Sequence, residues 1–137
     1  TPYHQNIARS LLKEPKIYFF DPTLGFNPES HLENLVAVSL LKHLWFLEDT
    51  QGSTCSLHYL RTRNGQEVDF LFSIDRKPVE MIEVKTNDQN FHKNLFYFQK
   101  YLPETKGIQI VQNLPKAKTK NGIHMKKVSA YLASLEL

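Results

Sequence analysis

The 137-residue sequence predicts a mixed α/β domain in which helices flank a four-stranded sheet. Two observations lead to this class. Apolar residues recur at helical spacing over residues 29–48, and three β-type segments follow before a second helical segment and a further strand. A tight hairpin makes its two strands antiparallel, whereas a helical crossover returns the chain to a parallel strand. The sheet is therefore expected to be mixed, with the element order α-β-β-β-α-β.

The amino-terminal part of the domain is predicted to be a strand, a loop and a long helix. Residues 1–15 end in a proline and are expected to be residual linker from an upstream domain, which leaves 16–137 as the α/β domain. Residues 16–20 (KIYFF) predict a strand, and 21–28 form a loop rich in turn residues. Ser30 is the expected N-cap of helix 29–48, with Glu33 completing a capping box. The expected inner positions of that helix are Leu32, Leu35, Val36, Ser39, Leu40, His43, Leu44 and Leu47.

The remaining elements follow from turn residues and periodicity. Asn64-Gly65 tolerates positive φ and predicts a hairpin between strands 57–62 and 67–74. A third strand at 78–85, a helix at 90–101 and a fourth strand at 107–111 complete the core of the prediction. A basic linker, 115–122, then leads to a short run at 123–127 and a last helix near 129–135.

Composition and charge indicate one soluble domain. Apolar residues make up 41% of the chain and charged residues 23%, enough for one core. The net charge of +3 is only mildly favourable to a polyanionic partner. Cys55 is the only cysteine, which excludes an internal disulfide and a cysteine-based zinc site. Together with the lack of an apolar run near ~20 residues, this favours a cytoplasmic protein without a membrane span.

The two central strands carry carboxylates that could act together. Because side chains alternate along a strand, Asp69 is expected to point away from an apolar row formed by Val68, Phe70, Phe72 and Ile74. The same rule places Glu83 and Lys85 on one face, opposite Ile82 and Val84. Two hard oxygen ligands on neighbouring strands are what Mg²⁺ requires, and a nearby ammonium could orient water and offset charge on phosphorus. These groups suit phosphodiester hydrolysis.

Asp69 followed by Glu83-Val84-Lys85 resembles the motif of the PD-(D/E)XK, or restriction-endonuclease-like, nucleases. Over about residues 7–111, the stretches KIYFFDPTLGF, HLENLVAVSLL, YLRTRNGQEVDFLF and IEVK also resemble an uncharacterised C-terminal domain of prokaryotic AAA-type P-loop ATPases. The resemblance implies a restriction-endonuclease-like fold, a Mg²⁺ (or Mn²⁺) cofactor, DNA as partner and an upstream ATPase domain. This chain itself has no GxxxxGK[ST] motif, so any ATPase site lies elsewhere.

The resemblance also implies roles for individual residues. Asp69 and Glu83 would be metal ligands, Lys85 the catalytic lysine and Glu33 the acid borne by the helix, while the backbone carbonyl of Val84 would also touch the metal. Val68 stands where the usual proline precedes the first acid. Further candidates for contacts with nucleic acid are Arg61 and Arg63 beside the hairpin turn, and Lys93 and Gln99 on the second helix.

Three functions remain open from the sequence: a metal-dependent DNA endonuclease, a catalytically silent module that recognises nucleic acid or protein, and an assembly domain. Charged residues also alternate on any half-exposed strand, and an acid in the first helical turn is favoured by the helix dipole. The six histidines lack metal-binding spacing and are expected to be structural or on the surface. The aromatics of the second helix are expected to pack, and the lysines of 115–122 to be solvated.

Overall fold

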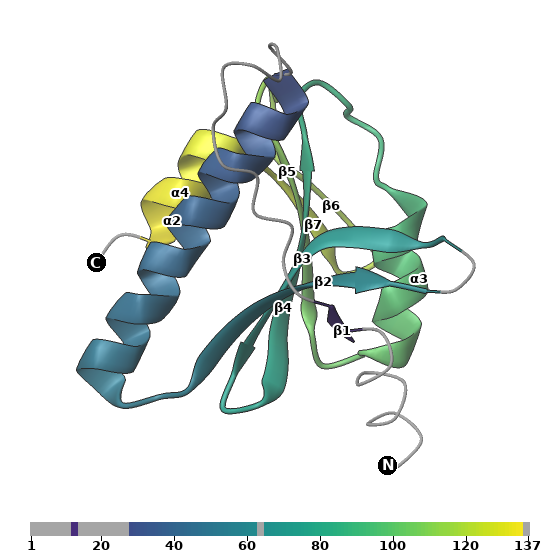
Figure 1. Ribbon diagram of the computed structural model, residues 1–137. Coiled ribbons are helices and arrows are strands. Elements are labelled where there is room, and N and C mark those ends of the chain that lie inside the picture. The colour runs from purple at the N-terminus through teal and green to yellow at the C-terminus, as the bar shows by residue number, and fades with distance from the viewer. Residues whose placement is uncertain (1–11, 14–27, 63–64, 136–137) are drawn as a thin grey trace.

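The computed structural model describes residues 12–13, 28–62 and 65–135 of the chain. Within these ranges the chain forms one seven-stranded sheet and three helices, so the predicted α/β class is confirmed (Figure 1). The elements are β1 (Leu12–Lys13), α2 (Pro28–Gln51), β2 (Cys55–Arg61), β3 (Glu67–Ile74), β4 (Lys77–Lys85), α3 (Lys93–Tyr101), β5 (Lys106–Val111), β6 (Lys118–Lys120), β7 (Ile123–Lys127) and α4 (Val128–Leu135).

The sheet is mixed, as predicted. Its strand order is β1-β2-β3-β4-β5-β7-β6. Strands β1 to β4 are antiparallel neighbours, β4, β5 and β7 run parallel, and β6 returns antiparallel to β7. The parallel pair β4 and β5 is joined through α3, the crossover that the sequence predicts.

The helices cover the two faces of the sheet unequally. Helices α2 and α4 lie side by side on one face, and α3 lies on the other (Figure 1). Val36 and Leu40 of α2 pack with Phe70, Phe72 and other residues of one buried cluster. A second cluster combines Leu60, Val68, Leu71, Met81 and Ile123 with Leu95 and Phe98 of α3 and with Leu102, which directly follows that helix. The two faces are called the α2 face and the α3 face below.

Helix α2 begins two residues earlier than Ser30. A proline is favoured in the first turn of a helix, and the helix here begins at Pro28, so Ser30 is not the N-cap and the expected capping box is wrong. The helix ends before Gly52, whose φ of 68° suits the left-handed residue after a helix and whose N–H donates to Glu48 O at 3.1 Å. Leu35 is 54% exposed, contrary to its predicted inner position.

The prediction of four strands was too low. Residues 118–120 form the edge strand β6 inside the segment expected to be linker, and β7 occupies the short run predicted at 123–127. Leu12–Lys13, inside the expected amino-terminal linker, pair with β2. The strand predicted at 16–20 lies outside the described residues. No helix in the described ranges is long and apolar enough to cross a membrane.

Candidate functional site

Asp69 lies at an irregularity in the pairing of β2 with β3. The register passes from His58 opposite Leu71 to Leu60 opposite Val68, so Asp69 and Phe70 together oppose a single residue of β2. This is a β-bulge, which breaks the alternation of side chains and redirects them. Val68 consequently packs in the cluster of the α3 face, whereas Phe70 packs on the α2 face. The prediction that Val68 and Phe70 share one face is therefore wrong.

The bulge aims Asp69 at β4. Asp69 Oδ2 accepts a hydrogen bond from the Val84 backbone N–H at 2.8 Å, and the Asp69 N–H donates to Glu83 Oε1 at 3.2 Å. Side-chain oxygens thus take the place of backbone carbonyls between the two strands at this point. The structure brings together the two carboxylates that the sequence predicted to act as a pair.

Glu83 is almost completely buried, with 4% of its surface exposed. Burial, together with a hydrogen bond and the negative charge of Asp69, raises the pKa of Glu83 to about 10, although the positive charge of Lys85 opposes this shift. The two carboxyl groups therefore hold a proton at neutral pH in the absence of a cation. A divalent ion could replace that proton.

Lys85 and Glu83 extend from the same face of β4, as predicted. Met81, two residues before Glu83, packs on the α3 face, and Ile82 and Val84 pack on the α2 face. Lys85 is half-buried at the end of the strand, and its charge acts on both Glu83 and His92. The acid-x-lysine segment therefore places a carboxyl group and an ammonium on one side of the sheet.

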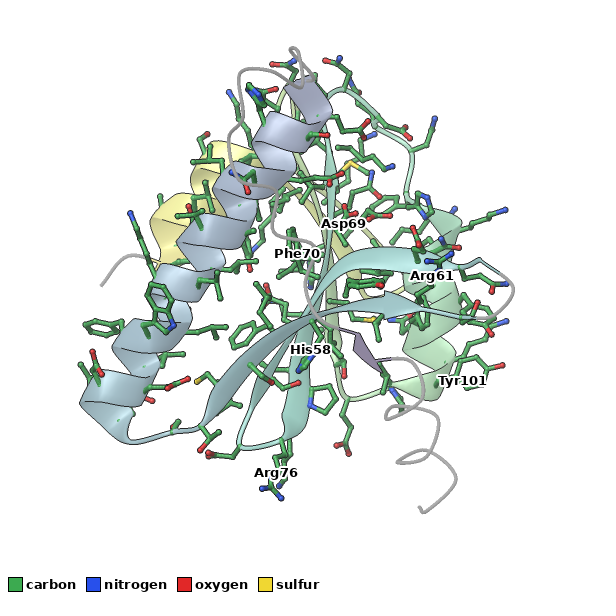
Figure 2. The ribbon with its side chains drawn as sticks, in the orientation of Figure 1. His58, Arg61, Asp69, Phe70, Arg76 and Tyr101 are labelled. Carbon is green, nitrogen blue, oxygen red and sulfur yellow. The ribbon has the colours of Figure 1, made fainter. Side chains whose placement is uncertain are left out.

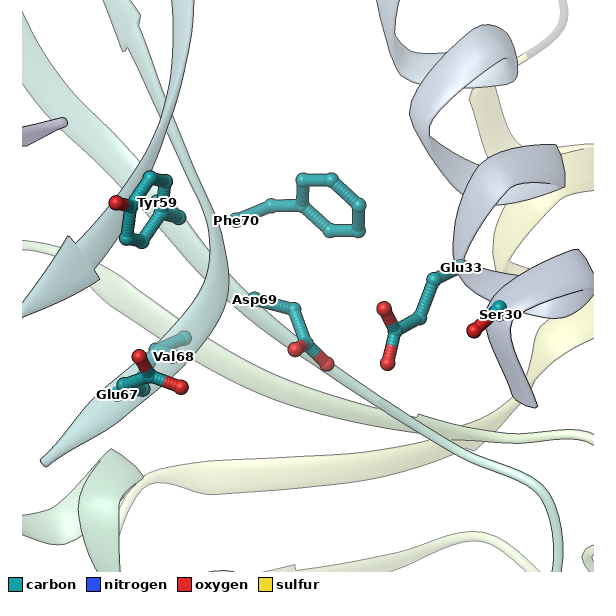
Figure 3. Close-up of a pocket in the computed structure, with 7 residues that line it drawn as sticks. All are labelled: Ser30, Glu33, Tyr59, Glu67, Val68, Asp69 and Phe70. Carbon is teal, nitrogen blue, oxygen red and sulfur yellow. The ribbon is translucent and has the colours of Figure 1, made fainter. Parts of the chain in front are cut away.

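Glu33 approaches the pair from the α2 side. A pocket of about 260 Å³ is lined by Ser30, Glu33, Tyr59, Glu67, Val68, Asp69 and Phe70. Figure 3 shows the carboxylates of Glu33 and Asp69 pointing toward one another across this pocket, with the ring of Phe70 extending toward α2. The second turn of α2 thus supplies a third acid, where the sequence predicted the acid borne by the helix.

His92 is a site residue that the sequence analysis missed. It caps α3, where its Nδ1 accepts the Asn94 N–H at 3.1 Å, and it lies 3.6 Å from Glu83 Oε2. Burial and the charge of Lys85 lower the pKa of His92. Because Nδ1 accepts a hydrogen bond and the ring is neutral at physiological pH, the contact with Glu83 is not an ion pair. Histidine is uncommon at N-caps, so no sequence pattern indicated this role.

Gln109 holds the loop that carries His92. It is fully buried on β5, opposite Glu83. Its Oε1 accepts the His92 N–H at 2.8 Å, and its Nε2 donates to Asn90 O at 2.9 Å and to Asp88 O at 3.3 Å. A buried amide that satisfies three loop groups fixes residues 88–92 against the site.

The predicted contacts with nucleic acid are spread more widely. Arg61 lies at the end of β2 near α3 (Figure 2) and pairs with Glu67 at 3.3 Å. Arg63 lies outside the described residues. Lys93 is exposed and lines a hollow of about 430 Å³ together with Gly65, Gln66, Asn94, Phe96, Tyr97 and Lys100. Gln99 is engaged elsewhere, since its Nε2 donates to Asn121 O at 3.1 Å.

The donor set fits Mg²⁺ in kind. This ion binds through one or two carboxylates and keeps several waters. Asp69 and Glu83 offer two such groups on neighbouring strands, and Glu33 lies across the pocket from Asp69. In the part of the chain that the structure describes, no group of three or more His, Cys, Asp or Glu side chains is already close enough to hold a metal. Glu83 and Asp69 instead use oxygens for hydrogen bonds between the strands, so ion binding would have to exchange these contacts.

Comparison with models of protein families matches residues 29–131, three quarters of the chain, to the family described as Domain of unknown function (DUF4143). The matched segment contains Glu33, Asp69, Glu83, Lys85 and His92. No curated protein and no solved structure matches the chain.

Proposed function

The chain belongs to the DUF4143 family, which brings no activity with it, and we propose from its site that it is a Mg²⁺-dependent DNA endonuclease domain. The observation that carries the proposal is the pair formed by the half-buried Asp69 and the buried Glu83, joined strand to strand through the Asp69 and Val84 N–H groups, with Lys85 on the same strand as Glu83. The proposal includes a restriction-endonuclease-like arrangement of the central strands and attachment to an upstream ATPase domain.

The free-energy cost of burying Glu83 next to a second carboxyl group supports a functional role for the pair. Solvated acids on a strand do not need burial, yet Glu83 is buried beside a second carboxyl group and acquires a strongly raised pKa. Such combinations of desolvation and like charge concentrate at functional sites. Two other local features position polar groups at this site. The β-bulge directs the Asp69 side chain toward β4, and the buried Gln109 side chain holds His92 close to Glu83.

Asp69 and Glu83 would hold the cation, with Glu33 and the Val84 carbonyl as further oxygen donors. When bound, Mg²⁺ supplies Lewis acidity toward the phosphoryl oxygen and lowers the pKa of bound water. Lys85 would orient the attacking water and offset the negative charge that grows on phosphorus. His92 and Gln109 keep the loop before α3 packed against Glu83, which limits the access of bulk water to its inner side.

The test is cleavage of supercoiled plasmid and linear duplex DNA in Mg²⁺ or Mn²⁺ by the wild-type chain, Asp69→Asn and Lys85→Met. Each substitution is expected to lower the rate by about a hundredfold or more, because each removes a group that acts on the transition state. Glu104→Gln and Lys77→Met serve as matched controls, since both residues are exposed and outside the site. Absence of metal-dependent cleavage by the wild type, or equal cleavage by Asp69→Asn, would overturn the proposal.

A catalytically silent module for recognition of nucleic acid or protein is the second candidate. The protonated pair and the absence of a ready cluster of three ligands in the described residues favour it. In that case the two carboxyl groups would stabilise the strand pairing only. The wild type would then bind Mn²⁺ no more tightly than Asp69→Asn.

A further inference from the structure

Lysines are unevenly distributed along this chain. Between Thr105 and Leu135 the sequence holds six lysines and no aspartate or glutamate. The rest of the chain therefore carries a net negative formal charge, although the whole chain has a charge of +3. An asymmetry of this kind is typical of a domain with one surface for polyanions.

Three of these lysines lie on or just before the edge strand β6. Every residue of β6 is exposed, and so is Lys116. β6 lies at the edge of the sheet next to α3 (Figure 1), and Gln99 of α3 contacts the β6–β7 turn. Lysines on an edge strand also discourage pairing with another chain. That protective role does not require the side chains to face any particular site.

The two lysines of β6 project on the α3 face. Lys118 pairs with Met125 and Lys120 with Ile123, and directly opposed residues point to the same face of a sheet. Met125 and Ile123 pack in clusters that also contain residues of α3 or of the loop before it. Lys118 Nζ donates to Gln89 O at 2.9 Å, in that same loop.

One row of the sheet joins Lys118 to the candidate site. Glu83 is opposite Gln109, Gln109 is opposite Met125, and Met125 is opposite Lys118. Three strand spacings amount to about 14 Å. Measured along the axis of a DNA duplex, this distance corresponds to about four base steps at 3.4 Å each. A strand with one phosphate at Glu83 therefore has others within reach of β6.

We propose that Lys118 and Lys120 bind the sugar-phosphate backbone of a nucleic acid that extends from the site of Asp69 and Glu83 toward the edge of the sheet. The identity of the ligand rests on the proposed function. The loop between the two places contains one carboxylate, Asp88, whose Oδ1 already accepts the Asn90 N–H at 2.9 Å. Lysine contacts to phosphate carry no sequence information, so this binding is independent of sequence and weakened by salt.

The test measures fluorescence anisotropy of a labelled 20-base-pair duplex, in EDTA and at several salt concentrations, with the 137-residue chain. Lys118→Glu/Lys120→Glu is expected to weaken binding by about tenfold or more and to lower the slope of log K against log salt by about 2. Lys42→Glu/Lys77→Glu changes the net charge equally at exposed lysines away from the α3 face and is expected to bind nearly as the wild type. Lys118→Gln/Lys120→Gln provides a milder pair should the charge reversal unfold the chain.

Each outcome decides the proposal. The proposal is overturned if the control pair loses as much affinity for DNA as the β6 pairs, or if both β6 pairs bind DNA as the wild type does. It is also overturned if the wild type does not bind DNA, or binds anionic phospholipid vesicles in place of DNA. Cleavage that depends on Asp69 but has the same KM in the β6 pairs would overturn this inference and leave the proposed function standing. Binding of DNA through β6 without any cleavage would overturn the proposed endonuclease function and leave this inference standing.

Discussion

Replacing Glu83 by glutamine should stabilise the metal-free domain at alkaline pH. The pKa of Glu83 is raised from 4.5 to about 10 in the folded chain, so the folded state keeps a proton that the unfolded state has lost. The contribution of this group to stability is complete below about pH 4.5 and is lost as pH rises toward 10. Glutamine has nearly the same shape and carries no charge, so the loss should disappear in the variant.

The size of the pH effect on the free energy of unfolding follows from the single proton that Glu83 keeps in the folded state and loses in the unfolded state. Stability should fall by about 1.4 kcal/mol for each pH unit in this range, or about 2 kcal/mol between pH 7 and pH 8.5. This window is chosen because the lowered pKa of His92 affects stability only below its ordinary value of 6.5, and the raised pKa of Cys55 only near and above 9. A change of this size is readily measured in a domain whose total stability is on the order of 10 kcal/mol.

The assay is urea unfolding in EDTA at pH 7 and pH 8.5 for the wild type, Glu83→Gln and the exposed control Glu104→Gln. The wild type and the control should lose stability with pH, and Glu83→Gln should not. Addition of Mn²⁺ should restore the wild type at pH 8.5 and leave Glu83→Gln nearly unchanged, since the ion replaces the shared proton. Equal slopes in the wild type and Glu83→Gln would refute the reasoning.

Two further substitutions test the surroundings of the site. Tyr131→Phe removes the hydrogen bond from the buried Tyr131 hydroxyl to Glu80 Oε1 at 2.5 Å, which joins α4 to β4, and should cost about 2 kcal/mol in urea unfolding; a variant as stable as the wild type would contradict that role. Gln109→Leu leaves three loop groups without their partner and should cost about 2 kcal/mol or more, with faster hydrogen exchange at the His92 amide; unchanged exchange would show that the loop is held by other contacts.

Strong periodicity and turn residues were sufficient for most of the fold. The hairpin of β2 and β3, the third strand and the crossover through α3 lie where alternation and helical spacing predicted them. The turn between β3 and β4 gave no such signal, because Asp75 and Arg76 both adopt positive φ without a glycine. The strand β6 was missed because a run of three exposed residues, KTK, has the composition of a solvated loop.

The sequence predicted the parts of the site that are set within a single strand. It did not predict the parts that are set by contacts between different strands and loops. The spacing of Glu83 and Lys85 placed both on one face, as the structure confirms. Asp69 was expected to follow simple alternation, but the bulge that redirects it arises from the register between β2 and β3. His92 and Gln109 are joined across 17 residues of sequence, and no local pattern encodes such a contact.

The most direct test of the account is calorimetric titration of Mn²⁺ into the wild-type chain and Asp69→Asn at pH 7.5. The account predicts one ion for each wild-type chain, release of a proton on binding, and no measurable binding by the variant. Equal affinity in the two chains, or no binding by the wild type, would contradict the central claim that Asp69 and Glu83 form a metal site.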